Sequence, residues 1–197
     1  SFNSAFGITL NQVTTPDRTY HTYDGELVIP ENLKEVIEGV LGLDNSIIFT
    51  HSATPYNPDT VGSPGLIPLT PQQVATAYNF PPNDGTGTCV AIIELGGGYT
   101  QQNLDSSFSR IGITPTPTVI TAYGTNSPGS DADIENMLDI YVIGGIVPRA
   151  TIAMYFSPGY PVGLYNAVAA AVNDNIRSPS VISVSYTHLT LPTIYSV

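Results

Sequence analysis

Hydrophobic and polar residues follow three different patterns along the chain, and the longest of them begins near residue 69. There, short and nearly continuous apolar runs alternate with stretches whose apolar residues recur every three or four positions. Short buried strands between helices are typical of a parallel sheet covered on both faces, which binds ligands at the carboxyl ends of its strands. The strands are expected at 88–95, 118–122, 151–156 and 181–185, and the helices at 70–78, 100–110, 131–146 and 163–173.

The first zone, residues 1–45, is more polar and has a different period. The pair Asp24-Gly25 separates two short runs, 22–23 and 26–29, and predicts a β-hairpin turn. Further on, apolar residues recur as on one face of a helix between Pro30 and Gly42. They are Leu33, Val36, Ile37, Val40 and Leu41.

Residues 46–68 form a second zone, in which prolines and glycines recur without a sustained hydrophobic period. Such turn-rich composition is typical of a linker between packed units. The chain is therefore expected to divide at this segment into a small amino-terminal part and a larger α/β part.

Composition and charge narrow the classes of function. The 197 residues include sixteen acids and only five bases, which gives a net charge of −11 and a pI of about 4.2. This balance excludes an ordinary nucleic-acid binder, whose affinity comes from lysines and arginines that neutralise phosphates. No apolar run approaches the roughly 20 residues that span a bilayer. Together with many glycines and prolines, the acidic balance favours a loop-rich, acid-tolerant secreted protein.

Two common catalytic arrangements have no support in the sequence. Cys89, the single cysteine, begins an apolar run with no base nearby, and we expect a small buried hydrophobe rather than a reactive thiol. The histidines His21, His51 and His188 lie away from the strand ends, so a Ser-His-Asp triad has no natural base.

A glycine-rich loop raises the alternative of a nucleotide site. Gly96-Gly97-Gly98 follows a predicted strand and precedes a predicted helix, but the dinucleotide fingerprint requires a glycine where Gln101 stands. The acid expected about 20 residues further on is also missing. A tight turn between strand and helix is the preferred interpretation.

Glu135 and Asp139 are the strongest candidates for chemistry. They lie four residues apart on a predicted helix, so they share one face. A solvated acidic stripe is the ordinary interpretation of such a pair. However, the helix is otherwise apolar beyond its first turn, and no base follows before Arg149. Two neighbouring carboxylates raise the pKa of one member, which suits a proton-sharing acid/base couple.

The blocks around this pair resemble the sedolisins, the serine-carboxyl peptidases, and in particular the kumamolisin group. The resemblance extends from about residue 6 to residue 185. The matching blocks are Phe6–Leu10, Val40–Asn45, Pro71–Ala75, Tyr78–Pro81, Val90–Tyr99, Ile134–Ile140, Gly144–Pro148 and Ile152–Pro158.

The resemblance implies a subtilisin-like α/β fold that works at acid pH, with an incomplete parallel sheet preceded by the end of an α+β propeptide. In this family a glutamate that matches Glu135 takes the proton of a catalytic serine, and an aspartate that matches Asp139 holds the glutamate. Glu94 matches a carboxylate that extends this hydrogen-bond chain, with a capping acid as the alternative. Ser185 and Tyr186 lie where the family lines its substrate cleft.

The chain also departs from the family pattern. The oxyanion-hole aspartate in a Gly-Asp-Ser-Gly stretch, the nucleophile in a Gly-Thr-Ser stretch and the calcium site of the family have no counterpart in these 197 residues. Residues 186–197 match no family element and resemble translated adapter sequence, with a diverged edge segment as the alternative.

These observations lead to a set of expectations. Residues 1–45 are the carboxyl-terminal part of an activation propeptide, 46–68 a linker with the processing region, and 69–185 the amino-terminal half of a peptidase domain. The whole protein is a secreted acid endopeptidase that uses Ca²⁺ and binds peptide substrates and its own propeptide, but neither nucleic acid nor membranes. A non-catalytic secreted α/β binding module on the same scaffold is the alternative.

We predict that limited proteolysis cuts this chain first within residues 46–68, because turn-rich segments between packed units are the preferred sites of nicking. Mass spectrometry of the earliest fragments identifies the cleavage site. A first cut within 88–156 would contradict the proposed division of the chain.

Overall fold

The computed structural model describes residues 2–47 and 69–185, which divide into two compact units. The described part of the first unit contains residues 2–47 and 158–165, and that of the second contains 69–157 and 166–185. The predicted linker lies almost wholly outside the described residues, and so does the tail 186–197.

Residues 2–47 contain a β-hairpin, but its turn is not at the predicted place. The short helix α1 (Phe2–Phe6) precedes strands β1 (Thr9–Thr14) and β2 (Thr19–Asp24), which pair antiparallel from Thr9 with Asp24 to Thr14 with Thr19. The turn is Thr15–Arg18, where the amide of Thr15 donates to the carbonyl of Arg18 at 2.9 Å. The prediction at Asp24-Gly25 was wrong because β1 is polar and lacks an apolar alternation that would mark it as a strand.

The helix predicted from residue 33 to 41 is not formed. The structure has a single 3-10 turn, η1 (Glu31–Leu33), followed by turns and irregular backbone. Short helices in proteins depend on packing of their apolar face. Here Val36 is 74% exposed and Leu41 49% exposed, so no core stabilises the helix. Whether residues 1–45 are a propeptide stays a prediction.

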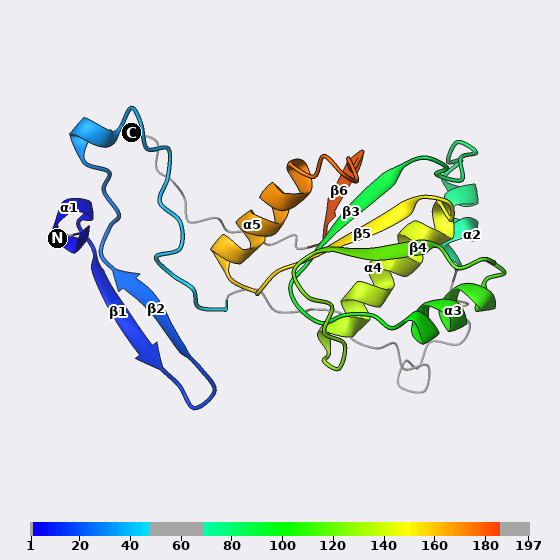
Figure 1. The fold of residues 1–197 in the computed structure, drawn as a ribbon, viewed down its shortest axis with the longest axis horizontal. Helices are drawn as coiled ribbons and strands as arrows, with labels where there is room; N and C mark the ends of the chain where they lie inside the picture. Colours follow the sequence, from blue (N-terminus) through cyan, green and yellow to red (C-terminus); the bar gives the residue numbers. More distant parts are fainter. Residues whose placement is uncertain (1, 48–68, 186–197) are drawn as a thin grey trace. The chain divides into compact units, whose positions relative to one another are not determined.

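The second unit is built on a four-stranded parallel sheet in the order β4-β5-β3-β6. Figure 1 shows these strands with α3 and α4 lying together beside them and α5 apart from both. The strands are β3 (Cys89–Glu94), β4 (Thr118–Tyr123), β5 (Thr151–Phe156) and β6 (Val181–Val184). The parallel sheet with its helices confirms the predicted α/β class. Strand β6 lies at one edge of this sheet.

The helices begin and end close to their predicted positions. They are α2 (Pro71–Ala77), α3 (Gln101–Arg110), α4 (Ala132–Ile146) and α5 (Pro161–Val172). Helix α2 begins with a capping box: the hydroxyl of Thr70 accepts the amide of Gln73, and the side chain of Gln73 accepts the amide of Thr70. Local capping signals therefore determined this helix start correctly.

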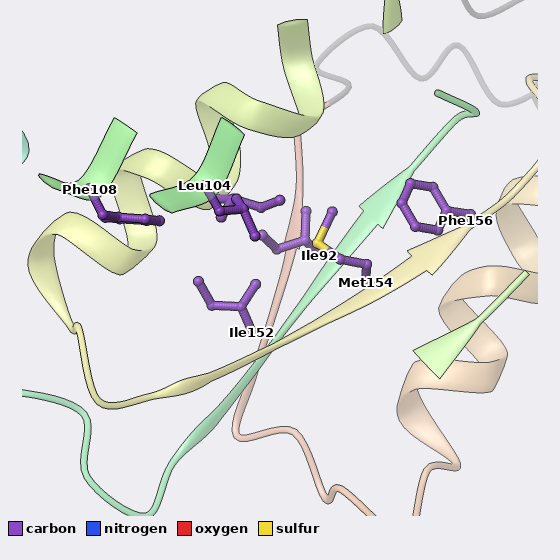
Figure 2. Packing of buried hydrophobic residues seen from close by; sticks show 7 residues of the cluster. Ile92, Leu104, Phe108, Ile152, Met154 and Phe156 are labelled. Carbon is purple, nitrogen blue, oxygen red and sulfur yellow. The ribbon is translucent and has the colours of Figure 1, made fainter. Parts of the chain in front are cut away.

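The main hydrophobic core lies between the sheet and the pair α3–α4. Figure 2 shows Leu104 and Phe108 of α3 beside Ile92, Ile152 and Met154 of the strands. Because successive side chains of a strand point to opposite faces, Ile92, Ile152 and Met154 all face these helices. The buried cluster consists of Ile92, Leu104, Phe108, Ile140, Ile152, Met154 and Phe156.

The other face of the sheet is also buried, and it carries a polar anchor. Ala91, Ile93 and Ala153 are fully buried there. Tyr155 donates its hydroxyl to Asp174 Oδ2 at 2.6 Å, and Arg177 donates to the same oxygen at 2.8 Å. Asp174 follows the end of α5, so this bond ties the end of the helix to β5.

We predict that Tyr155→Phe lowers the free energy of unfolding by about 1 kcal/mol, because a buried hydrogen bond is lost while the ring packing is kept. The matched control is Tyr123→Phe, since Tyr123 pairs with Tyr155 across β4 and β5 but is 40% exposed. Urea unfolding of both variants checks the difference. Equal effects of the two substitutions would contradict a role of the Asp174 bond.

Candidate active site

The amino-terminal half of α4 lies at the carboxyl end of β3 because glycine allows a close approach there. The side-chain amide of Asn136 donates to the carbonyl of Gly96 at 3.1 Å. A Cβ atom at Gly97, whose φ is +68°, would lie 2.6 Å from Asn136 Nδ2 and 2.7 Å from the Cβ of Ala132. Any larger residue would therefore push the loop away from the helix that carries the candidate acids.

Asp133 holds together the loops that follow β3 and β4. Its Oδ1 accepts the amide of Gly98 at 2.8 Å, and its Oδ2 accepts the amide of Gly129 at 2.6 Å. Asn126 accepts the amide of Tyr99 at 2.8 Å and donates to the carbonyl of the same residue at 3.0 Å. The amides of Gly98 and Tyr99 are thus already satisfied, in one case by a carboxylate. This arrangement argues against phosphate binding and supports the tight-turn interpretation of Gly96–Gly98.

Both candidate acids of α4 are half-buried, one turn apart. The hydroxyl of Ser185 donates to Asp139 Oδ2 at 2.5 Å. Ser185 comes directly after β6, whose last residue Val184 pairs with Ile93 of β3. Asp139 therefore faces the sheet near its carboxyl end, which excludes a fully solvated acidic stripe.

Glu94 ends β3 and is completely buried, with an exposed fraction of 0%. Its side chain points to the same face of the sheet as that of Ile92, two residues earlier, and this face is covered by α3 and α4. Complete burial places the carboxyl group of Glu94 in the interior of the second unit. Strand register also places Glu94 level with Ser185, since both follow the paired residues Ile93 and Val184.

Burial controls the protonation of Asp139. Desolvation disfavours its charged form and raises the pKa of its carboxyl group above the ordinary value, while the hydrogen bond from Ser185 lowers the pKa and offsets part of this effect. A carboxyl group with a raised pKa retains its proton further up the pH scale. It is therefore suited to share a proton with Glu135 in mildly acidic solution.

Other candidates for chemistry lie elsewhere or outside the described residues. Cys89 is buried at the amino end of β3, and burial raises the pKa of its thiol, as expected for an inert cysteine. His21 belongs to the hairpin of the first unit, where its Nε2 lies 2.8 Å from the carbonyl oxygen of Gly42. Tyr186, predicted to bind substrate, falls outside the described range.

The loop-holding roles of Asp133 and Asn136 and the bond between Ser185 and Asp139 were not predicted. The sequence pattern gave no signal for them, because the bonds to Gly98, Gly96 and Ser185 join segments at least 35 residues apart. Within residues 2–47 and 69–185, no three His, Cys, Asp or Glu side chains gather as metal ligands.

Comparison with known proteins identifies the family of this chain. No family model matches it. Kumamolisin of Bacillus sp. (strain MN-32) is 37% identical over 198 residues, which cover 93% of this chain and 36% of that protein. The chain belongs to the sedolisin family.

A solved structure is also similar. Pseudomonas sedolisin, a serine-carboxyl proteinase complexed with two molecules of pseudo-iodotyrostatin, is 25% identical and matches 57% of this chain and 33% of its own chain with a TM-score of 0.47. This chain spans about a third of the length of these relatives. The catalytic roles of Glu135, Asp139 and Glu94 stay predictions.

We predict that Asp139→Asn raises the melting temperature at pH 7. Because the folded-state pKa of Asp139 is raised, ionisation of this group opposes folding at neutral pH, and the amide removes that charge. The gain should shrink as the pH falls through the pKa of Asp139, since the wild-type group is then neutral as well. Circular dichroism melts from pH 3 to pH 7 measure this dependence.

The control for this test is Asp105→Asn. Hydrogen bonds from Thr116 and Gln101 lower the pKa of Asp105, so its charged form favours folding and the amide should lower the melting temperature at pH 7. The same sign of change for both substitutions would show that Asp139 is not held in a desolvating environment.

Proposed function

We propose that this chain supplies the general base and its supporting carboxylate to an acid-acting serine-carboxyl endopeptidase. The observation that carries the proposal is the placement of Asp139 against Ser185 at the carboxyl end of the sheet, on the helix face that Glu135 shares. Family membership supports peptide-bond hydrolysis as the reaction class.

In this proposal Glu135 accepts the proton of the attacking serine, and Asp139 holds Glu135 in place. A carboxylate is a suitable base at pH 4, where a histidine would already be protonated. Two adjacent acids that share one proton also avoid placing two charges in a desolvated site. Glu94, buried at the end of β3, would extend this proton-sharing group into the sheet.

The nucleophile must come from outside these 197 residues, because they contain no Gly-Thr-Ser sequence. Acyl transfer needs a nucleophile, a base and an oxyanion donor around one carbonyl carbon. We therefore regard the chain as the amino-terminal part of a zymogen, with its propeptide in residues 1–45. Calcium would be bound by other parts of the whole protein.

The remaining features of the whole protein are also part of this proposal. The acidic composition suits a secreted protein that acts on peptides in acid surroundings. None of the described helices has the length and apolar character needed to cross a membrane. Substrate contacts are proposed for Ser185 and Tyr186, which follow the edge strand β6.

The first test is to sequence the parent gene beyond the codon for residue 185, where the proposal expects a Gly-Thr-Ser segment. The isolated chain should show no peptidase activity at pH 3–5, whereas the parent protein should be active. In the parent, we predict that Glu135→Ala lowers kcat by about 100-fold or more and leaves KM nearly unchanged, because the base acts mainly in the transition state. Steady-state assays with a fluorogenic peptide measure both constants.

Asp131→Asn is the matched control, since Asp131 precedes the same helix, is exposed and makes no capping hydrogen bond. It should leave kcat and KM unchanged. Cleavage by the isolated chain that Glu135→Ala abolishes would show that the nucleophile has been misplaced. An inactive parent that binds peptides would instead support the alternative of a non-catalytic binding module.

A further inference from the structure

The hydrogen bond between Ser185 and Asp139 joins two segments that are 46 residues apart in the sequence. Asp139 lies in the middle of α4, and Ser185 directly follows the edge strand β6. The hydroxyl of Ser185 donates to Asp139 Oδ2. Ser185, which is predicted to contact substrate, thus uses its side chain for a hydrogen bond to the Asp139 carboxylate.

The hydroxyl of Ser185 matters because the charged groups around Asp139 do not stabilise its carboxylate form. The other charged groups on α4, β3 and β6 are all carboxylates, namely Asp133 and Glu135 on α4 and Glu94 on β3, so none of them favours a further negative charge. Arg110 lies at the opposite end of α3 from the loop that follows β3. The other bases of this unit, Arg149 and Arg177, pair with Asp84 and Asp174.

We propose that Ser185 is a positioning residue that fixes the Asp139 carboxylate through Oδ2 and leaves Oδ1 to hold Glu135. This inference rests on the proposed function of Glu135 and Asp139. A hydroxyl that donates to a carboxylate stabilises its charged form, and it also restricts rotation of the carboxylate group. A charged Asp139 has less tendency to take up the shared proton, so a proton that Glu135 accepts from the serine stays on Glu135. The main chain of Ser185 remains available to substrate.

Carboxyl-carbon NMR titration of the 197-residue chain tests the inference without any need for activity. Ser185→Ala and Ser185→Cys both remove the strong donor, and the thiol of cysteine keeps most of the side-chain volume while donating only weakly. We expect the titration midpoint of Asp139 to rise by about one pH unit in both variants. Ser185→Thr, which restores a hydroxyl, should return the midpoint to the wild-type value.

Ser183→Ala is the matched control. Ser183 lies on β6, two residues before Ser185, so its side chain is expected to point to the same side of the sheet as that of Ser185. Both substitutions remove the same hydroxyl group. It should leave the midpoint of Asp139 unchanged. A midpoint that stays at the wild-type value in both Ser185→Ala and Ser185→Cys, or one that shifts equally in Ser183→Ala, would overturn the inference.

Kinetics of the parent protein separate positioning from substrate binding. If Ser185 acts through Asp139, Ser185→Ala should lower kcat about tenfold with little change in KM, and threonine should restore the rate. A change confined to KM would overturn the positioning role and favour direct substrate contact. An inactive parent whose Asp139 midpoint still shifts as expected would refute the proposed peptidase function but leave the contact and its electrostatic effect established.

Discussion

The close approach of the loop after β3 to the first half of α4 is the constraint on which the candidate site depends. Because Gly97 lacks a side chain, this loop can lie directly against Ala132, and the carbonyl of Gly96 can accept a hydrogen bond from the side-chain amide of Asn136. The approach determines the height and rotation of α4 relative to the sheet. With that rotation, hydrophobic residues such as Ile140 enter the core, while Asp139 reaches Ser185 just beyond the end of β6.

Burial of acidic groups at this edge has an electrostatic cost that the rest of the unit must offset. A half-buried carboxylate loses hydration, and the described bases of this unit pair elsewhere or lie far along α3. Hydrogen bonds are therefore the means of stabilisation, as Asp133 shows by accepting two loop amides and Asp139 by accepting the hydroxyl of Ser185. Stabilising carboxylates by hydrogen bonds requires little positive charge, in agreement with a chain that has only five Lys and Arg residues.

Much of the second unit could be predicted from the sequence because its signals are local. Apolar runs, the capping box at Thr70 and the i, i+4 spacing of the acids are each complete within a few residues. The first unit shows the limit of such signals. The periodic residues from 33 to 41 form no helix, and Val36 and Leu41 among them remain exposed. The strand Thr9–Thr14 was missed because most of its residues are polar. In both cases tertiary contacts decide the outcome, and these are invisible in a local pattern.

Two aspartates of the same unit show why the chemistry of a site cannot be derived from residue type or spacing alone. Asp174 accepts hydrogen bonds from Tyr155, from Arg177 and from the amide of Ile176, and these donors hold its pKa well below the ordinary range. Asp139 is desolvated and accepts one hydroxyl, so its pKa moves in the opposite direction. An acid surrounded by donors stays charged and serves the fold, whereas an acid with a single donor can exchange its proton. The number of donors that tertiary structure provides thus separates the anchoring aspartate from the candidate catalytic one.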